Sequence, residues 1–219
     1  MGERRVAGVA GVVFAVSTVL QFVVAPAPPS WDASGSEIRD WFVDHREGVL
    51  VQGWLMVVAV FAFIVFLVGV CDLLRRTTDG AARATVAALG GGVAAAALLV
   101  GQAAFNAAVW IDGNAEASAD DTVRLVWSMA CLLIYGASMP GIVLLAGAVA
   151  VGRRNDAVPV WSARVAAVVA LLGVAGTLIQ FGPVFAWFAL AAFLGLVLFS
   201  VALAVPMITH GSRPMEPHA

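Results

Sequence analysis

Charged residues are scarce in this chain of 219 residues, and lysine is absent altogether. Charged side chains make up 12% of the sequence, against 62% for hydrophobic side chains. A soluble domain of this size cannot bury so large an apolar fraction in its interior. The composition therefore excludes an ordinary soluble domain and predicts a protein whose solvent is lipid.

Cysteine and metal-ligand patterns are also nearly missing. The two cysteines, Cys71 and Cys131, lie in apolar stretches without a CxxC motif or a histidine-rich neighbourhood. This argues against a disulfide framework and a structural zinc site, and we expect no metal and no cofactor. The arginines form small clusters that membrane topology already explains, so nothing predicts binding to nucleic acid.

The apolar residues are gathered in runs long enough to cross a bilayer. A hydrocarbon core of about 30 Å requires about 20 residues of helix. The period-two alternation of strands is absent, and unpaired backbone groups are costly in lipid. We predict an all-α, polytopic bundle of six transmembrane helices in a single membrane domain, residues 1–219. The expected helices span residues 6–25, 49–74, 84–110, 125–151, 165–181 and 184–207.

Arginine is distributed unevenly between the two sides of these helices. Nine of the twelve arginines fall on the side of the two termini, and only Arg39, Arg46 and Arg124 fall on the other. Because arginine is retained on the cytoplasmic side during insertion, both termini are predicted to be cytoplasmic. We expect a multi-pass protein of the bacterial cytoplasmic (inner) membrane, with the lipid bilayer as its surroundings.

Three of the segments begin with arginine and end near a glutamine. Residues 5–21 and 164–180 align without a gap, and residues 83–102 form a looser third copy. Topology explains the arginines, but it does not explain glutamine at this position. Two explanations stay open: three repeated hairpins, or chance similarity in sequence of low complexity. An aromatic belt explains the tryptophans at the outer ends of the even helices, Trp54, Trp127 and Trp187.

Several polar side chains fall at a similar depth, in the outer part of the predicted bundle. They are Gln21, Gln52, Gln102, Asn106, Ser128 and Gln180. An amide in hydrocarbon is costly unless it finds a partner. The functional interpretation is a pocket, open to the outside, that hydrogen-bonds a neutral or zwitterionic head group. The alternative is that these groups bond to one another or to the backbone, at about 0.6 kcal/mol each, and only fix the packing.

The middle of every segment lacks ionisable residues, whereas proton relays and ion-coupled carriers place such residues there. Ion pumping is therefore not expected, and Asp72, near the inner end of its helix, is interpreted as a boundary residue.

Pro140 lies in the fourth segment with Gly136 before it and Gly141 after it, and this predicts a kink in the helix. Because broken helices mark binding sites in some transporters, a facilitative transporter remains an alternative function. The glycine run 90–92 predicts close contact between helices.

The first outer loop has the most distinctive soluble pattern. Ser34 and Glu37 match a capping box, and apolar residues follow at helical spacing. This predicts a short amphipathic helix over residues 35–47 at the outer interface. A membrane-embedded enzyme could use the polar face for acid–base or metal chemistry, whereas the alternative is a face that is simply solvated. The candidate catalytic residues on this face are Asp40, Asp44 and His45.

An acidic amphipathic segment followed by an aromatic-rich helix with paired arginines fills residues 30–76, SWDASGSEIRDWFVDHREGVLVQGWLMVVAVFAFIVFLVGVCDLLRR. This stretch resembles a family of uncharacterised small six-helix integral membrane proteins of actinobacteria. The resemblance covers mainly the first hairpin and implies no activity and no functional residue.

The function that we predict is a non-catalytic bundle that binds a lipid-like or small amphipathic ligand, or a membrane protein partner, from the extracytoplasmic side. Its support is the layer of amides and the missing intramembrane charge. One alternative is an enzyme that uses carboxylates of the outer loops on a lipid or isoprenoid substrate. A second alternative is a facilitative transporter.

Overall fold

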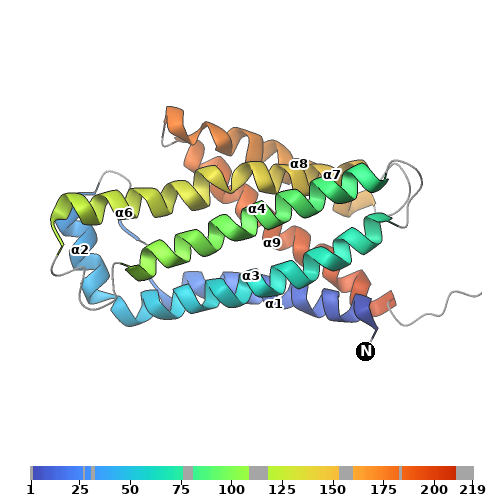
Figure 1. The fold of residues 1–219 in the computed structure, drawn as a ribbon, viewed down its shortest axis with the longest axis horizontal. Helices are drawn as coiled ribbons and strands as arrows, with labels where there is room; N and C mark the ends of the chain where they lie inside the picture. The colour runs from blue at the N-terminus through green and yellow to red at the C-terminus, as the bar shows by residue number, and fades with distance from the viewer. Residues whose placement is uncertain are drawn as a thin grey trace, which may run out of the picture.

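The fold is built from helices that coincide with the apolar runs of the sequence. The computed structural model describes residues 2–26, 28–30, 33–75, 81–108, 118–152, 160–182 and 184–210. These residues contain no strand, and six helical spans among them are long and apolar enough to cross a membrane. The elements, shown in Figure 1, are α1 (Glu3–Val24), α2 (Gly35–Asp44), α3 (Arg46–Arg75), α4 (Ala81–Ala108), α6 (Asp120–Leu132), the π-helix η2 (Leu133–Ala137), α7 (Met139–Gly152), α8 (Val160–Gly176), the 3-10 helix η4 (Thr177–Phe181) and α9 (Val184–His210).

The predicted all-α class with six membrane-length helices is confirmed, and this is the architecture of a multi-pass membrane protein. All the spanning helices except α9 begin three to five residues before the expected ranges. The reason is that hydropathy marks only the apolar part of a helix, while backbone hydrogen bonding continues into the polar flanks. The expected end of the third segment, residues 109–110, lies outside the described residues.

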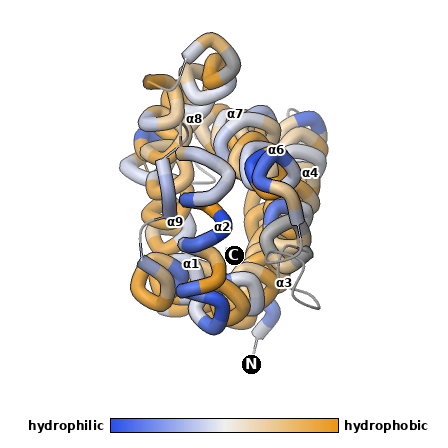
Figure 2. The backbone as a smooth tube through the Cα atoms, turned by 90° about the vertical axis from the view of Figure 1, so that its left-hand side faces the viewer, coloured by the Kyte–Doolittle hydropathy of each residue, from blue (hydrophilic) through white to orange (hydrophobic). Residues whose placement is uncertain are grey.

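The spanning helices form a closed ring in the order of the sequence. Each one packs against the next, from α1 and α3 through α4, α7, α8 and α9, and α9 returns to α1. The first and last described residues lie at one end of the bundle, which we call the terminal end (Figure 1). Helix α2 lies at the opposite end, which we call the α2 end. In the end-on view of Figure 2, α2 crosses the space that the other helices surround.

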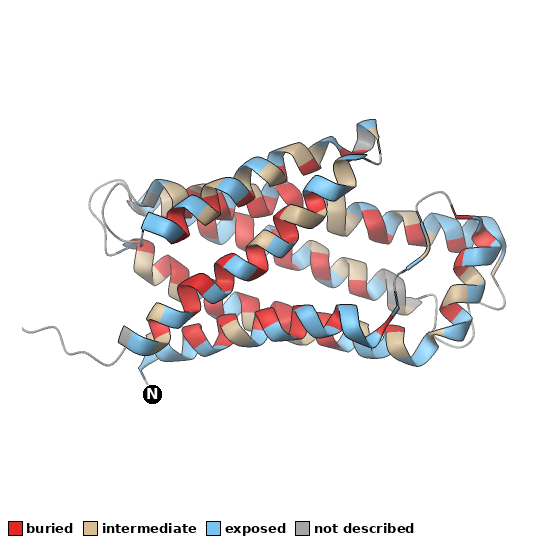
Figure 3. Cartoon of the chain, turned by 180° about the vertical axis from the view of Figure 1, so that it is seen from behind, coloured by how far each residue is buried: buried red, intermediate tan, exposed pale blue. Residues whose placement is uncertain are grey.

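Small residues allow the helices to approach closely in the terminal half of the ring. A Cβ added at Gly11 would lie 2.7 Å from the ring of Phe66, and one added at Gly91 would lie 2.6 Å from the main-chain oxygen of Gly141. Buried residues face the interior of the ring along these helices (Figure 3). The close contact expected for the glycine run 90–92 is therefore present at Gly91 and at Gly92, where a Cβ would lie 2.6 Å from the side chain of Leu67, whereas Gly90 faces open space.

Helix α2 is shorter than the sequence predicts. It ends at Asp44, and His45 leaves the helical conformation, with φ −116° and ψ 21°. The chain then turns directly into α3 at Arg46. The prediction over residues 35–47 is wrong for its last three residues, because the turn at His45 joins them to the following membrane helix.

The capping box at the start of α2 is confirmed. The main-chain N–H of Glu37 donates to Ser34 Oγ at 3.2 Å, and the N–H of Ser34 donates to Glu37 Oε2 at 2.8 Å. Two of the backbone donors at the start of the helix are thereby satisfied, which fixes where α2 begins.

Candidate functional site

A cavity of about 440 Å³ lies between the helices at the α2 end, and its volume falls in the range typical of small-molecule sites. Three glutamines, Gln21, Gln52 and Gln102, contribute its amide groups, so we call it the amide cavity. Its described walls come from α1 and the segment after it, α2, α3, α4, α6, η2 and α9. Its aromatic residues are Phe22, Trp41, Trp127, Tyr135, Trp187 and Phe193.

Two of the glutamines are held by main-chain carbonyl groups. Gln52 Nε2 donates across the helix pair to the main-chain oxygen of Gln21 at 3.3 Å. Gln21 Nε2 donates to the main-chain oxygen of Ser17, one turn earlier on α1, at 3.4 Å. Since a carbonyl only accepts, each amide must direct its nitrogen to the backbone. The Gln52 amide thus joins α3 to α1, whereas the Gln21 amide bonds within α1. No described residue donates to either Oε1, so both amides retain an acceptor.

The other four predicted polar residues have three different outcomes. Gln102 lines the amide cavity from α4 and makes no side-chain hydrogen bond with a described residue. Ser128, on α6, does not belong to the described lining. The side chains of Asn106 and Gln180 lie outside the described part of the structure. The described residues thus bring three of the predicted polar side chains together around one cavity.

Trp127 is a wall residue that sequence reasoning assigned to the aromatic belt. It is only 9% exposed, whereas the other two predicted belt residues, Trp54 and Trp187, are 65% and 72% exposed. Its ring packs against Phe42 and Trp41, with ring centroids 5.7 and 6.4 Å away. The belt interpretation is wrong for Trp127 because α2 covers the start of α6. Its Nε1 is buried without a hydrogen-bond partner among the described residues.

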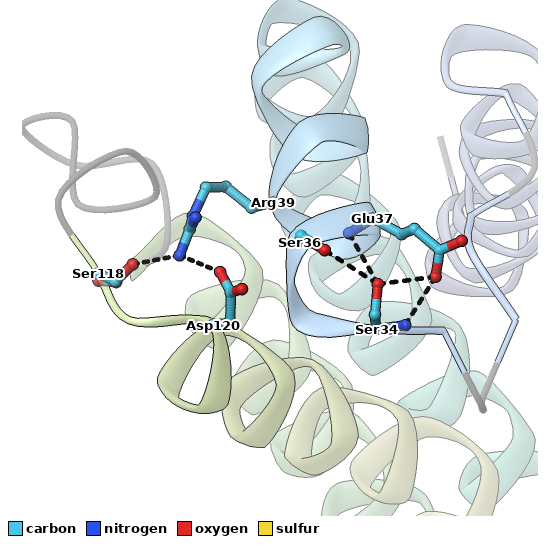
Figure 4. A network of polar contacts seen from close by, with 6 residues as sticks. All are labelled: Ser34, Ser36, Glu37, Arg39, Ser118 and Asp120. Atoms are coloured by element: carbon cyan, nitrogen blue, oxygen red, sulfur yellow. Dashed lines mark hydrogen bonds and ion pairs between the residues drawn. The ribbon is translucent and has the colours of Figure 1, made fainter.

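The contact between α2 and α6 places Trp41 in the cavity wall. Arg39 forms an ion pair with Asp120 and donates to the main-chain oxygen of Ser118 (Figure 4). Gly35 is needed on this face, because a Cβ there would overlap the backbone of Asp120. Beneath the polar contacts lies a small apolar cluster that contains Ile38, Phe42, Val123, Trp127 and Cys131. The apolar face of α2 is therefore buried on the bundle.

A π-helical turn that follows α6 directly shapes the adjoining part of the wall. The main-chain N–H of Ser138 donates to the oxygen of Leu133 at 3.1 Å, five residues earlier, and Pro140 follows two residues later. The irregularity expected near Pro140 thus takes the form of this turn, and such turns are frequent at functional sites. Ile134 and Tyr135, both within the turn, line the amide cavity.

One side of the amide cavity faces the surroundings of the bundle. Phe22 on α1 and Trp187 on α9 line the cavity, yet they are 54% and 72% exposed. The 3-10 helix η4, which follows α8, also stops short of the far end of α6 (Figure 1). The opening between α1 and α9 is therefore bounded by apolar surface of the kind that contacts lipid.

None of the candidate catalytic residues belongs to the described lining of the amide cavity, but His45 contacts the wall residue Trp41, with ring centroids 5.2 Å apart. Asp40 and Asp44 are exposed on α2 and do not belong to the described lining. His45 is half-buried, with Nδ1 2.7 Å from the main-chain oxygen of Trp41. No group of three histidine, cysteine or acidic residues in the described ranges is placed to hold a metal ion.

Asp72 lies at the opposite end of the bundle from the amide cavity. Its carboxylate pairs with Arg4 at 3.8 Å, and both side chains are partly exposed. This placement agrees with a boundary residue near the membrane surface.

The side-chain groups that line the amide cavity indicate the kind of ligand that it can bind. Its described lining offers amides, indoles, one phenol and apolar groups, but no charged side chain. Such a wall suits a ligand that is partly apolar and forms a few hydrogen bonds. Comparisons with protein-family models, with curated proteins and with solved structures found no match to this chain.

Proposed function

We propose that this protein is a non-catalytic binding module of a bacterial cytoplasmic membrane, which takes a lipid-like or small amphipathic molecule into the amide cavity. The observation that carries the proposal is the composition of the wall. Three amides lie among aromatic and apolar side chains, next to an opening bounded by the exposed Phe22 and Trp187. A polar head group fits among the amides, and an apolar tail leaves between α1 and α9.

The distribution of arginine supports an extracytoplasmic position for the amide cavity. Arg4, Arg5, Arg75, Arg83 and Arg164 belong to the terminal end, where arginine favours the cytoplasmic side. Both termini are then cytoplasmic, and the α2 end faces outward. The resemblance of the first hairpin to small actinobacterial membrane proteins agrees with this layout, and we propose membership of that family.

Native mass spectrometry of the protein released from mild detergent, with lipid extraction of the same sample, tests the proposal. We expect a small molecule or lipid retained at a fixed stoichiometry. Gly53→Phe should abolish retention, because Gly53 lines the amide cavity and an added Cβ there has no neighbour within 4 Å.

Gly90→Phe is the matched control, since Gly90 also has open space around its Cβ position but lies outside the described lining. Retention that survives Gly53→Phe, or a mass without any bound molecule in the wild-type protein, would contradict the proposal.

A further inference from the structure

The lining of the amide cavity includes three glutamines, whose Oε1 atoms are hydrogen-bond acceptors. Gln21 and Gln52 each direct Nε2 to a main-chain oxygen, and Oε1 of each amide receives no donor from a described residue. Oxygen acceptors favour a head group that is positively charged or rich in hydrogen-bond donors.

Aromatic faces surround these acceptors. Trp41, Trp127, Tyr135 and Trp187 all line the amide cavity, and the rings of Trp41 and Trp127 lie 6.4 Å apart at 47° to each other. The face of an indole attracts an ammonium group, and aromatic walls of this kind bind quaternary ammonium ligands. No arginine or histidine belongs to the described lining, so an anionic head group would find no counter-charge there.

The surface around the α2 end carries excess negative charge. Asp40 and Asp44 are exposed on α2, and Asp121 is exposed at the start of α6. Six acidic residues of this end outnumber three arginines among the described residues: Glu37, Asp40, Asp44, Glu47, Asp120 and Asp121 against Arg39, Arg46 and Arg124. Of these arginines, Arg39 is engaged by Asp120. A surface of this sign raises the local concentration of cations and lowers that of anions.

We infer that the amide cavity selects amphiphiles whose head group is an alkylated ammonium, held against the indole faces and the glutamine oxygens. This inference rests on the proposed function and names its ligand class. The head group can belong to a cationic or to a zwitterionic amphiphile.

Isothermal titration of the protein in maltoside micelles tests the selectivity. The four ligands are octyltrimethylammonium, octylphosphocholine, octyl glucoside and octyl sulfate, which share one tail and differ in the head group. We expect the two ammonium ligands to bind at least about tenfold more tightly than the other two. The tighter of the two ammonium ligands identifies the cationic or the zwitterionic source. Equal or tighter binding of the glucoside or the sulfate would overturn the inference.

Three variants connect the selectivity to the wall. Gln102→Glu should tighten binding of octyltrimethylammonium by about tenfold, because a carboxylate attracts a cation more strongly than an amide does. Trp41→Leu should weaken that binding by about tenfold, while the exposed Trp54→Leu should leave it unchanged. A Gln102→Glu protein that binds octyltrimethylammonium no more tightly than the wild type would contradict the inference.

The same titrations separate this inference from the proposed function. If all four ligands bind with similar affinity and Gly53→Phe removes them all, the amide cavity is a binding site without ammonium selectivity. If none of them binds and no molecule is retained in native mass spectrometry, both proposals fail.

Discussion

Gln52 and Gln21 are joined across two helices by a hydrogen bond from Gln52 Nε2 to the main-chain oxygen of Gln21, 3.3 Å long. One amide thus serves packing and cavity lining together, so the two interpretations of the glutamines are not exclusive. Gln102 lines the same cavity without such a bond to a described residue.

Leucine substitutions should separate the two roles. Gln52→Leu removes an interhelical hydrogen bond, and we expect the free energy of unfolding to fall by about 0.6 kcal/mol. Gln102→Leu should leave that free energy nearly unchanged while it weakens ligand binding. Reversible unfolding in mixed micelles, followed by circular dichroism, measures the first effect. A loss at Gln102 as large as that at Gln52 would assign Gln102 to packing as well.

Neighbouring glycines on α4 should respond in opposite directions to alanine. Gly91→Ala brings a Cβ within 2.6 Å of the main-chain oxygen of Gly141, so the helices must separate. We expect a loss of about 1–3 kcal/mol in the free energy of unfolding. Gly90→Ala meets no neighbour within 4 Å and should stabilise the helix by up to about 1 kcal/mol. Equal effects of the two changes, measured by thermal unfolding, would contradict the packing of α4 against α7.

The packing of α2 against α6 should depend on Gly35. Gly35→Val places a side chain against the backbone of Asp120 and should displace α2. Cys131 is buried in the apolar cluster beneath α2, so its thiol reports the displacement. In a Cys71→Ala background, we expect a water-soluble maleimide to react at least about tenfold faster with Gly35→Val than with the parent, because the exposed fraction of the thiol rises.

Asp40→Ala is the control for this experiment, because Asp40 lies on the exposed face of the same helix. An unchanged rate in Gly35→Val, or an equally raised rate in Asp40→Ala, would show that α2 does not shield Cys131 in this way.

Substitutions of the α2 carboxylates should distinguish a binding protein from an enzyme. Asp40 and Asp44 are exposed and lie outside the described lining of the amide cavity. We expect Asp40→Ala and Asp44→Ala to leave unfolding within about 0.5 kcal/mol of the wild type and to leave ligand retention intact. Turnover of the retained molecule that disappears in either variant would favour the enzyme alternative.

The sequence predicted those parts of the fold that depend only on residues close together in the chain. The membrane helices follow from apolar length, and the start of α2 follows from Ser34 and Glu37. The placement of Gln21, Gln52 and Gln102 around one cavity agrees with their similar predicted depth. Depth along a helix was not sufficient for Ser128, because membership of the wall also depends on which face of α6 turns inward.

Contacts between distant segments could not be predicted from the same rules. The burial of Trp127 depends on α2 folding back over α6, and the residues that hold it there, Arg39 and Asp120, are far apart in the sequence. The π-helical turn at Tyr135 could not be predicted either, since a nearby proline indicates an irregular helix without specifying its hydrogen bonds. The apolar face of α2, with Ile38 and Phe42, was the available signal that a second surface covers it.

The ring order of the helices has a consequence for biogenesis. Each spanning helix after α1 packs against the helix that precedes it in the chain, and α9 packs against α1 as well. In a chain inserted from its N-terminus, the contact between α1 and α9 forms only after synthesis of α9. Until then, Gln21 and Gln52 border an unfinished groove that is open to lipid or to an insertion factor. The wall of the amide cavity is therefore completed only when α9 packs against α1.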